Sequence, residues 1–336
     1  MKIVLGIDAI NIRGGGIVHL KNIINQRKYI KFDKIIIWGN KEVLSNIKYN
    51  SKIKKIYNKN FDKKLLFRFF WQLLFFKNSI KKNKVNCMFY LSGFFLKKIT
   101  TSVVFFQNIL PFYPEIIKEY NIFKRIKFYF QKLLFLNSAK KSNFVIFPSL
   151  NFQKIFQLYD KNMKYKSSII YHGAEKKFIK NNRKDKIISI FPSSFQKFKN
   201  HKKLIEAISI LKNKNKFSLD LYGPGNKKEI KQVIYKIEKI NGLNKIIKYK
   251  GQKDYNYIFE NYNLLIYPSK CESFGLPLLE SALSGLKVAC SDIPIFREIL
   301  GKYAFYFNPN SSKSIANCLY KISRKKINKK NIIKLK

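Results

Sequence analysis

Short apolar runs alternate with longer amphipathic stretches through most of the chain, and this rhythm predicts an α/β fold. A short run bounded by polar residues is typical of a strand in a buried parallel sheet, whereas apolar residues at helical spacing indicate the connecting helices. The first half contains six such runs, at residues 2–7, 34–38, 85–90, 102–106, 143–147 and 168–171. The second half contains six more, at residues 187–191, 218–222, 246–249, 264–267, 287–289 and 304–307.

A polar and strongly charged stretch separates the two sets of runs and is typical of a linker. The simplest architecture is therefore two doubly wound, Rossmann-like domains that face each other across a cleft. The expected bounds are residues 1–178 for the N-terminal domain, 179–186 for the linker, 187–322 for the C-terminal domain and 323–336 for a lysine-rich tail.

Composition adds an unusual charge to this picture. The 336 residues are 46% hydrophobic, enough for two cores, and their formal net charge is +49, from 61 lysines and seven arginines against 19 acids. Such a charge suggests an anionic partner, either nucleic acid or a membrane surface. A bias of an AT-rich genome toward lysine, at surface positions that tolerate many residues, explains the charge as well. Arginine, whose planar guanidinium group binds phosphates through paired hydrogen bonds, is scarce in this chain. This scarcity favours genome bias over a nucleic-acid partner as the cause of the charge.

Cysteines, histidines and apolar segments restrict the compartment. The four cysteines form no CxxC pair and the three histidines are scattered, so we expect neither a disulfide framework nor a metal site. The N-terminus enters an expected strand directly, without the features of an export signal. The most apolar segment, residues 65–76, is broken by Arg68 and is shorter than the roughly 20 residues that a membrane span needs. These features predict a cytoplasmic protein.

The richest motif is YPSKCESFGLPLLE at residues 267–280, which leaves a strand, turns through Gly275 and enters a helix near Pro277. Proline suits a first helical turn, and glycine lets the backbone approach a ligand. The free N–H groups at the helix start favour a phosphate there. Glu272 and Glu280 can accept hydrogen bonds from sugar or ribose hydroxyls. The motif fits a nucleotide-sugar site, and an ordinary strand–loop–helix unit with two solvated acids fits it equally well.

In the context ESFGLPLLESALSG, the two acids with seven residues between them resemble the signature of the family 4 retaining glycosyltransferases, which have the GT-B fold. The similarity continues through ACSDIPIFREI and reaches back to FPSSFQKFKNHKKLIEAI and LDLYGPG. It covers the second half nearly end to end and the first half in patches.

The resemblance implies roles for individual residues of the motif. Relatives use the acid that matches Glu272 near the sugar hydroxyls and the acid that matches Glu280 on the ribose hydroxyls. The backbone at Phe274, Gly275 and Leu276 would face the sugar and the diphosphate.

Three further donor-site residues follow from the resemblance. Lys199 matches a lysine that neutralises the diphosphate, whose negative charge grows as the glycosidic bond breaks. Without the resemblance, Lys199 is one more surface lysine. Many relatives have an arginine where this chain has Ser193, so one positive charge is absent there. Gly223, in the LDLYGPG segment, is the remaining donor-binding candidate.

In the first half, a run of three glycines follows the first strand and precedes an expected helix at residues 19–24. By itself it is a tight turn, but relatives close such a loop over the donor, which implies donor contacts for Gly15 and Gly16. In the segment FFQNILPFYPE, some relatives carry histidine where this chain has Gln107 or Asn108. Neither amide is a general base at neutral pH, so Asn108 would orient the acceptor while the departing phosphate takes its proton.

The resemblance therefore predicts a retaining, metal-independent glycosyltransferase that needs no cofactor beyond its donor. It would move a hexose-type sugar from a nucleotide diphosphate to a saccharide or polyprenyl-linked acceptor, in bacterial lipopolysaccharide or polysaccharide biosynthesis. The N-terminal domain would bind the acceptor and the C-terminal domain the donor. A nucleotide-sugar epimerase of the same fold is the nearer alternative. A nucleic-acid-binding protein is the more distant one, because no RNA-module signature or arginine-rich stripe accompanies the charge.

Two basic, aromatic stretches remain, at residues 61–84 and 120–141. In the second, apolar residues recur at helical spacing among lysines: Ile122, Ile126, Tyr129, Phe130, Leu133 and Leu134. A helix lying on an anionic membrane has this pattern, and so has a helix that buries the same stripe in the core of the first domain. Relatives usually end with a helix that crosses back to the first domain; here that element would be the short lysine-rich tail, or it would be missing.

Overall fold

The computed structural model describes residues 2–25, 31–48, 50–164, 166–174, 187–211, 216–252 and 259–324. The chain divides into two compact units. The first contains Met1–Ile117 and Asn121–His172, and the second contains Lys118–Tyr120 and Gly173–Lys336. The division after His172 falls inside the stretch expected for the first domain, and residues 118–120 within that stretch belong to the second unit. The expected linker at 179–186 lies outside the described residues, as does the expected tail from residue 325.

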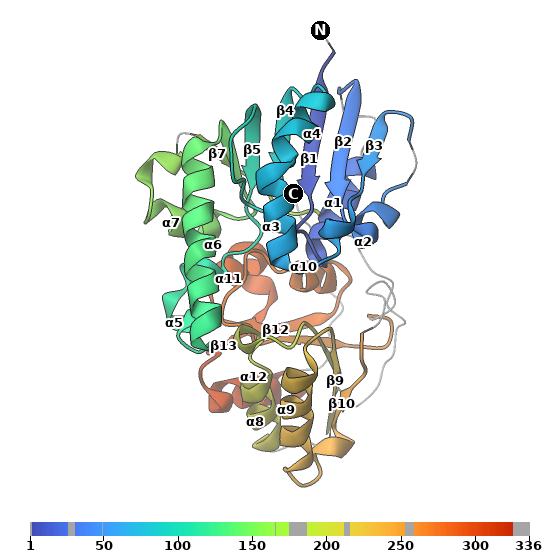
Figure 1. Ribbon diagram of the computed structural model, residues 1–336. Coiled ribbons are helices and arrows are strands. Elements are labelled where there is room, and N and C mark those ends of the chain that lie inside the picture. Colours follow the sequence, from blue (N-terminus) through green and yellow to red (C-terminus); the bar gives the residue numbers. More distant parts are fainter. Residues whose placement is uncertain are drawn as a thin grey trace. The chain divides into compact units, whose positions relative to one another are not determined.

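The first unit is built on a parallel sheet with strand order β3-β2-β1-β4-β5-β6-β7. Figure 1 shows α3 and α4 lying in front of this sheet. Its strands are β1 (Val4–Ala9), β2 (Lys34–Gly39), β3 (Ile53–Ile56), β4 (Cys87–Tyr90), β5 (Thr101–Phe105), β6 (Phe144–Phe147) and β7 (Ser167–Ile169). Its helices are α1 (Gly15–Asn25), α2 (Lys41–Ser45), α3 (Leu65–Leu74), α4 (Phe76–Lys82), α5 (Pro114–Ile117), α6 (Ile122–Lys141) and α7 (Leu150–Gln157).

Both faces of the first sheet are packed, which explains why its strands are apolar runs rather than alternating ones. Successive residues of a strand point to opposite faces. In β2, Ile36 and Trp38 join one hydrophobic cluster while Ile35 and Ile37 join another. The clusters on the two faces fix the register of the sheet, because a slip of one residue would exchange them.

The second unit repeats the design with strand order β10-β9-β8-β11-β12-β13, all parallel. A single hydrophobic cluster joins its strands and helices. The strands are β8 (Ile187–Pro192), β9 (Phe217–Tyr222), β10 (Ile247–Tyr249), β11 (Leu264–Tyr267), β12 (Lys287–Ser291) and β13 (Phe305–Phe307). The helices are α8 (His201–Ser209), α9 (Lys227–Glu238), α10 (Leu276–Leu283), α11 (Pro294–Leu300) and α12 (Ser312–Arg324).

The α/β prediction is confirmed, and each of the expected strands is present within two residues of its expected ends. Strand β3 was not predicted from the sequence; among the described strands it pairs only with β2, at the edge of the sheet. Its two middle residues, Lys54 and Lys55, are exposed, and charged residues on an edge strand discourage pairing with other chains. The expected tail also starts too early, because Ser323 and Arg324 belong to α12.

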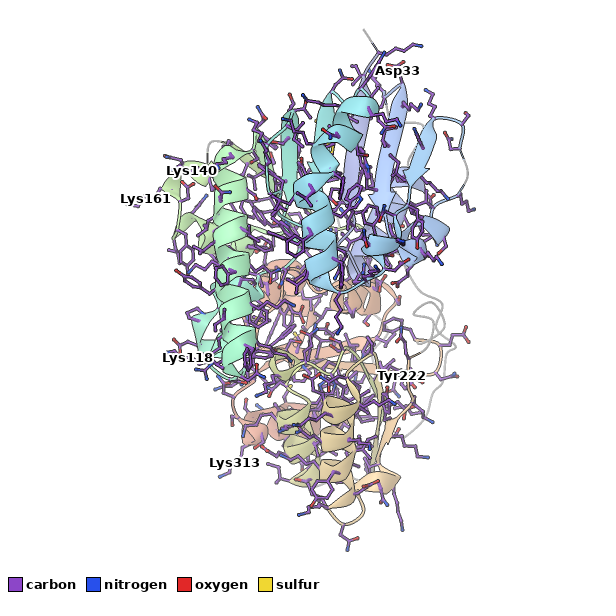
Figure 2. The ribbon with its side chains drawn as sticks, viewed as in Figure 1. Asp33, Lys118, Lys140, Lys161, Tyr222 and Lys313 are labelled. Atoms are coloured by element: carbon purple, nitrogen blue, oxygen red, sulfur yellow. The ribbon has the colours of Figure 1, made fainter. Side chains whose placement is uncertain are left out.

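Charge lies on the surface of both units. Figure 2 shows Lys140, Lys161 and Lys313 extending away from the ribbon. Of the lysines that the structure describes, only Lys199 is buried. A surface of solvated lysines is compatible with both an anionic partner and genome bias. Neither explains why Lys199 is buried, so the reason for its burial must lie in its surroundings.

Candidate functional site

The second sheet contains a switch point between β8 and β11. Strands β9 and β10 continue the sheet on one side of β8, whereas β12 and β13 continue it on the other side of β11. In open parallel sheets, ligands bind beyond the carboxyl ends of the strands at such a point. The segment after β8 contains a short helical turn, Lys197–Lys199, and the segment after β11 contains the glycine turn. Both segments carry residues predicted from the sequence.

Lys199 and Glu272 form an ion pair at this switch point, although 73 residues separate them in the sequence. Their side chains are 11% and 13% exposed. The Lys199 ammonium also donates a hydrogen bond of 3.1 Å to the hydroxyl of Tyr267, the last residue of β11. Lys199 and Glu272, predicted to act on the diphosphate and on the sugar, therefore lie in contact, together with a tyrosine that was not predicted.

The ion pair keeps a positive charge in the site. Burial disfavours the ammonium of Lys199, but the Glu272 carboxylate outweighs this effect and raises the pKa of the lysine above its usual value. Burial raises the pKa of Tyr267, which keeps its hydroxyl protonated. Burial, with a smaller effect from Lys199, lowers the pKa of His201 to about 3. At neutral pH Lys199 is therefore charged and His201 is neutral.

Backbone contacts hold the two site segments together. Asn200 adopts a left-handed conformation (φ 65°), which asparagine tolerates better than most residues. Its side-chain amide donates hydrogen bonds to the carbonyls of Pro268, at 3.2 Å, and Pro309, at 2.7 Å. The N–H of Lys270 donates to the carbonyl of Phe198 at 2.8 Å. Lys199 and Glu272 therefore belong to segments whose backbones are fastened to each other.

The three residues between α5 and α6 reinforce this fastening within the second unit. The carboxylate of Glu119 lies 2.5 Å from the ammonium of Lys270, and its carbonyl accepts a hydrogen bond from the ammonium of Lys197. Tyr120 is buried, and its ring centroid lies 5.7 Å from the Lys197 ammonium. The sequence offered no signal for this role, because these residues stand between two helices of the other unit.

The glycine turn leads into α10 as predicted. Gly275 has φ 109° and precedes the first residue of the helix, Leu276, with a proline in the first turn. A side chain at Gly275 would place its Cβ 2.7 Å from Leu278 and 3.2 Å from Phe296, so only glycine fits. The first N–H groups of an α-helix have no partner within the helix. The start of α10 is therefore a suitable anion site.

The remaining predicted residues of the motif lie around this helix start. Phe274 and Glu280 are buried and Leu276 is half-buried. Glu280 is only 7% exposed, which is unusual for a carboxylate. The structure therefore disfavours the alternative of two solvated acids, because both Glu272 and Glu280 are largely withdrawn from water.

Ser193 and Gly223 follow the neighbouring strands β8 and β9 and contact each other. A Cβ at Gly223 would lie 2.3 Å from the carbonyl oxygen of Ser193, so glycine is needed for the two backbones to approach. The N–H of Gly223 already donates to Gly251 at 3.1 Å. Gly223 thus has a clear packing role, and its donor contact stays a prediction. Ser193 is buried beside it.

The first unit contains the other predicted residues. Helix α1 begins at Gly15, four residues earlier than expected, so Gly15 and Gly16 form its first turn. A Cβ at Gly16 would meet the Gln107 side-chain oxygen at 2.8 Å, which places this turn against the FFQNILPFYPE segment. The side chain of Asn108 accepts the N–H of Leu110 at 3.1 Å. Asn108 therefore caps a local turn, and its predicted role toward an acceptor stays open.

Two histidines meet near this turn. The Nδ1 atoms of His19, in α1, and His172, at the end of the first unit, lie 3.0 Å apart, so one ring donates and the other accepts. The ring of His19 also stacks on Phe105, with centroids 4.8 Å apart. Burial lowers the pKa of His19 to about 4, and burial with the neighbouring ring lowers that of His172 to about 3. Both rings are neutral at physiological pH.

Among the described residues, no helix is long and apolar enough to cross a membrane, and no three His, Cys, Asp or Glu side chains gather as metal ligands would.

The second unit matches the family model "Glycosyl transferases group 1" over residues 173–335. A 60-residue stretch is 42% identical to the O-antigen chain mannosyltransferase RfbU of Salmonella typhimurium, covering 18% of this chain and 17% of the relative. A 131-residue stretch is 24% identical to O-antigen chain mannosyltransferase B of Escherichia coli, covering 38% and 34%. The matched stretches thus span well under half of these curated relatives.

Solved structures match along almost the whole chain. HepE of Anabaena, solved with UDP and glucose, aligns with a TM-score of 0.72 at 16% identity, over 96% of this chain and 90% of that one. WaaG, a glycosyltransferase involved in lipopolysaccharide biosynthesis, aligns with a TM-score of 0.69 at 12% identity, over 96% and 91%. These matches show the GT-B fold. The second unit is therefore similar to the glycosyl transferases group 1 family, whose model it matches.

Proposed function

We propose that the protein is a retaining glycosyltransferase that takes a hexose from a nucleotide diphosphate sugar. The observation that carries this proposal is the buried Lys199–Glu272 pair at the switch point of a unit that is similar to the glycosyl transferases group 1 family. The N–H groups at Gly275 and Leu276 and the charge of Lys199 would hold the diphosphate. Glu280 would accept the ribose hydroxyls, and Glu272 would accept those of the sugar.

The chemistry follows from where charge develops. As the glycosidic bond breaks, negative charge builds on the leaving diphosphate, and a lysine that is charged at neutral pH stabilises it most in the transition state. This lysine would supply the positive charge that a metal ion supplies in other transferases. The acceptor hydroxyl then attacks from the side on which the diphosphate leaves, and the diphosphate takes its proton. Asn108 would orient the acceptor.

We expect mannose to be the first sugar to test, because several of the curated relatives are mannosyltransferases. The roles of these relatives in O-antigen synthesis also suggest bacterial surface polysaccharide as the product. The acceptor would be a saccharide or a lipid-linked saccharide, reached from the cytoplasmic face of the membrane. The exposed apolar residues of α6 support membrane association, since Phe123 is 80% and Phe130 60% exposed.

A screen of nucleotide sugars for thermal stabilisation tests the proposal. GDP-mannose, UDP-glucose and UDP-N-acetylglucosamine should be included, and the preferred donor at 100 times its Kd should add about 2.7 kcal/mol of stability. Product analysis with and without a saccharide acceptor then separates transfer from epimerisation, NMR of the product shows whether the anomeric configuration is retained, and EDTA should leave the rate unchanged. Absence of stabilisation by any nucleotide sugar would refute the proposal.

Glu280→Ala tests the ribose contact directly. The ribose is present in the free nucleoside diphosphate, so the substitution should weaken binding of the nucleotide without its sugar. Loss of one charge-assisted hydrogen bond costs roughly 1.5–3 kcal/mol. Calorimetry measures this on a variant whose fold is verified by circular dichroism. Unchanged affinity for the nucleotide would show that Glu280 does not contact the ribose.

A further inference from the structure

A pocket with both polar and apolar lining lies in the first unit, apart from the residues discussed so far. It has a volume of 110 Å³ and is lined by the end of β1, the last turn of α3, the start of α4 and the segment after β4. The first sheet has its own switch point between β1 and β4, where ligands of parallel sheets bind. At 110 Å³ the pocket exceeds the space that a single water molecule needs, so a small anionic group can enter it.

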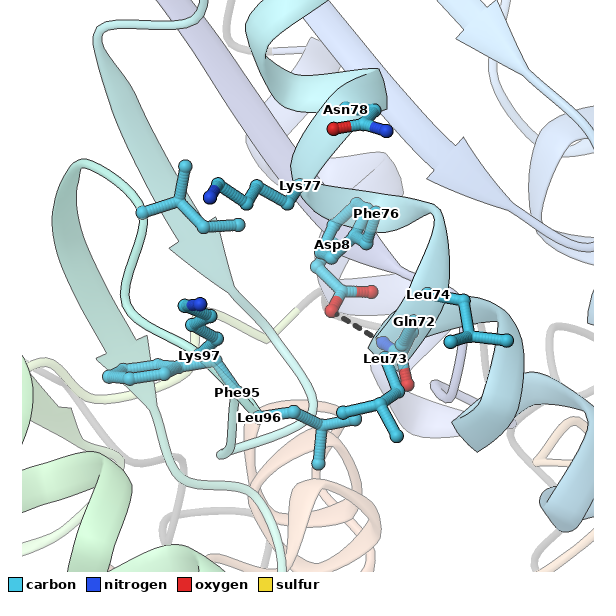
Figure 3. A pocket seen from close by; sticks show the side chains of 11 residues that line it. Asp8, Gln72, Leu73, Leu74, Phe76, Lys77, Asn78, Phe95, Leu96 and Lys97 are labelled. Atoms are coloured by element: carbon cyan, nitrogen blue, oxygen red, sulfur yellow. Dashed lines mark hydrogen bonds between the residues drawn. The ribbon is translucent and has the colours of Figure 1, made fainter.

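The floor of the pocket is a fully buried carboxyl group, Asp8. It accepts hydrogen bonds from the N–H of Ile10, at 3.1 Å, and from the side-chain amide of Gln72, at 2.9 Å. Gln72 in turn accepts a hydrogen bond of 3.2 Å from Asn11. Figure 3 shows Asp8 and Gln72 joined at one end of the pocket. This network fastens the last turn of α3 to the end of β1.

Asp8 cancels only part of the positive charge of the pocket at neutral pH. Burial raises its pKa to about 7, against the lowering effect of its two hydrogen bonds. A carboxyl group with this pKa is about half protonated at pH 7, and its protonated form can donate a hydrogen bond to an anion.

Two lysines supply the positive charge. Lys77, at the start of α4, and Lys97, after β4, line the pocket with flexible and exposed side chains. Figure 3 shows both side chains on the side of the pocket away from Gln72. Within the described part of the chain, neither lysine forms an ion pair or a hydrogen bond. Two ammonium groups without a protein partner at a small pocket are suited to an anion with several oxygens.

The helix above the pocket is apolar and uncovered. Only Trp71 and Gln72 of α3 are buried. The exposed side chains include Leu66, at 68%, and Phe70, at 56%. A helix of a soluble domain normally turns its apolar stripe to the core, so an exposed stripe of this size indicates an apolar ligand or surface. Two of the pocket's own lining residues, Leu73 and Leu74, belong to the same exposed stripe.

We propose that this pocket binds the phosphate group of a lipid phosphate, with the phosphate between Lys77 and Lys97 and the apolar chain along α3. The inference rests on the proposed function and deepens it, because it makes the acceptor a lipid-linked one. An apolar face that adjoins a cationic pocket of this size matches an amphiphile with a small anionic head. It does not match a free saccharide, which has neither a charge nor an apolar chain.

The test measures binding of geranyl phosphate, a short and soluble isoprenoid phosphate, to the full chain. Lys77→Gln/Lys97→Gln should weaken its binding at least tenfold. The matched control is Lys81→Gln/Lys98→Gln, which removes the same charge from residues that do not line the pocket and should change affinity less than twofold. Equal effects of the two double variants would overturn the proposal, because only the overall charge would then matter.

Two further ligands separate the head from the chain. Geraniol, which lacks the phosphate, should bind at least tenfold more weakly than geranyl phosphate to the wild type. Inorganic phosphate should also bind at least tenfold more weakly, and Phe67→Ser/Phe70→Ser should weaken geranyl phosphate while leaving inorganic phosphate unchanged. Binding of inorganic phosphate as tight as that of geranyl phosphate would make this a free-phosphate site and refute the lipid.

The outcome is distinguishable from a failure of the proposed function. Donor binding is measured in the second unit by nucleotide stabilisation, which should be the same in the wild type and in Lys77→Gln/Lys97→Gln. If geranyl phosphate binds as expected while no nucleotide sugar stabilises the protein, the lipid site stands and the transferase proposal fails. If nucleotide sugars stabilise the protein while geranyl phosphate does not bind, the lipid site is refuted alone.

Discussion

Lys199 and Lys236 show how differently two ion pairs of the same protein are placed. Lys199 and Glu272 are 11% and 13% exposed, whereas Lys236 and Glu206 are 28% and 36% exposed. Removing one member of a buried pair leaves the other charge without compensation in a poorly solvated place. An exposed pair loses little, because water replaces the missing partner.

Lys199→Ala should therefore lower the free energy of unfolding by about 3–5 kcal/mol. The matched substitution Lys236→Ala should lower it by less than about 1 kcal/mol. Denaturant titrations of the two variants measure the difference. Equal effects would mean that water reaches Glu272 as easily as it reaches Glu206.

The same variant carries a kinetic expectation, which is measured below its unfolding transition. Lys199 would oppose charge that develops only during bond breaking, so turnover should fall more than donor affinity. Weakened donor binding with turnover retained at saturating donor would contradict this role.

The histidine pair should make stability depend on pH. The unfolded rings have pKa values near 6.5, and the folded ones about 4 for His19 and about 3 for His172, so the unfolded state binds more protons below pH 6.5. The stabilisation is complete above that pH and is lost on acidification, at about 1.4 kcal/mol per pH unit for each ring. His172→Phe should lose less stability than the wild type between pH 7 and pH 5. Asp8 and His201 also titrate, but they are present in both proteins. Parallel curves of unfolding free energy against pH for the two proteins would exclude a role for the histidine pair.

Among the elements, α6 settles one of the alternatives left open by the sequence. Its buried residues are Phe135, Ser138 and Ala139, near its C-terminal end. Most apolar residues from Ile122 to Leu133 are exposed, from Leu133 at 43% to Phe123 at 80%, while Phe128 and Leu134 are half-buried. The N-terminal half of α6 is therefore not part of the core. The alternative in which its apolar stripe is buried in the first domain is wrong. An exposed apolar and basic surface is the remaining explanation of the pattern.

Replacing Lys124, Lys127 and Lys132 together with Gln should release the protein from anionic vesicles. Each basic residue near such a surface contributes about 1 kcal/mol, and 1 M salt, where the Debye length is about 3 Å, should imitate the substitution. The matched control replaces Lys227, Lys228 and Lys231 of α9, which are also exposed, and should leave sedimentation unchanged. Equal sedimentation of the wild type and the α6 variant, or equal binding of the wild type to neutral vesicles, would refute the membrane role of α6.

At the scale of the whole molecule, the same design appears in both units. Each sheet has a strand order that reverses beside its first strand, β1 or β8, and each has polar residues beyond the carboxyl ends at that point. The second unit places Lys199 and Glu272 there, and the first places Asn11 there, joined through Gln72 to Asp8 near the end of β1. Two independent cores allow each unit to hold its own ligand, which suits a reaction between a donor and an acceptor.

The strands and the glycine turn could be predicted from the sequence because their causes are local. A strand buried on both faces must be an apolar run, and a backbone with φ 109° at a close contact must be glycine, as at Gly275. The edge strand β3 was not predicted because it is less buried than the other strands. Its exposed middle residues, Lys54 and Lys55, interrupt the apolar run that marks a buried strand. The resemblance supplied Lys199, which no local pattern distinguishes from the other lysines.

By itself, the sequence determined the order of strands and helices, the position of the glycine turn and the resemblance of the second unit to a glycosyltransferase family. Only the tertiary structure decided which charged residues are partners. Lys199 meets Glu272 from a distance of 73 residues, and Asp8 meets Gln72 from a distance of 64. Only the structure also showed that the apolar sides of α3 and α6 are uncovered. The helical spacing of apolar residues in the sequence shows that a helix has an apolar face. What covers that face depends on how the whole unit packs.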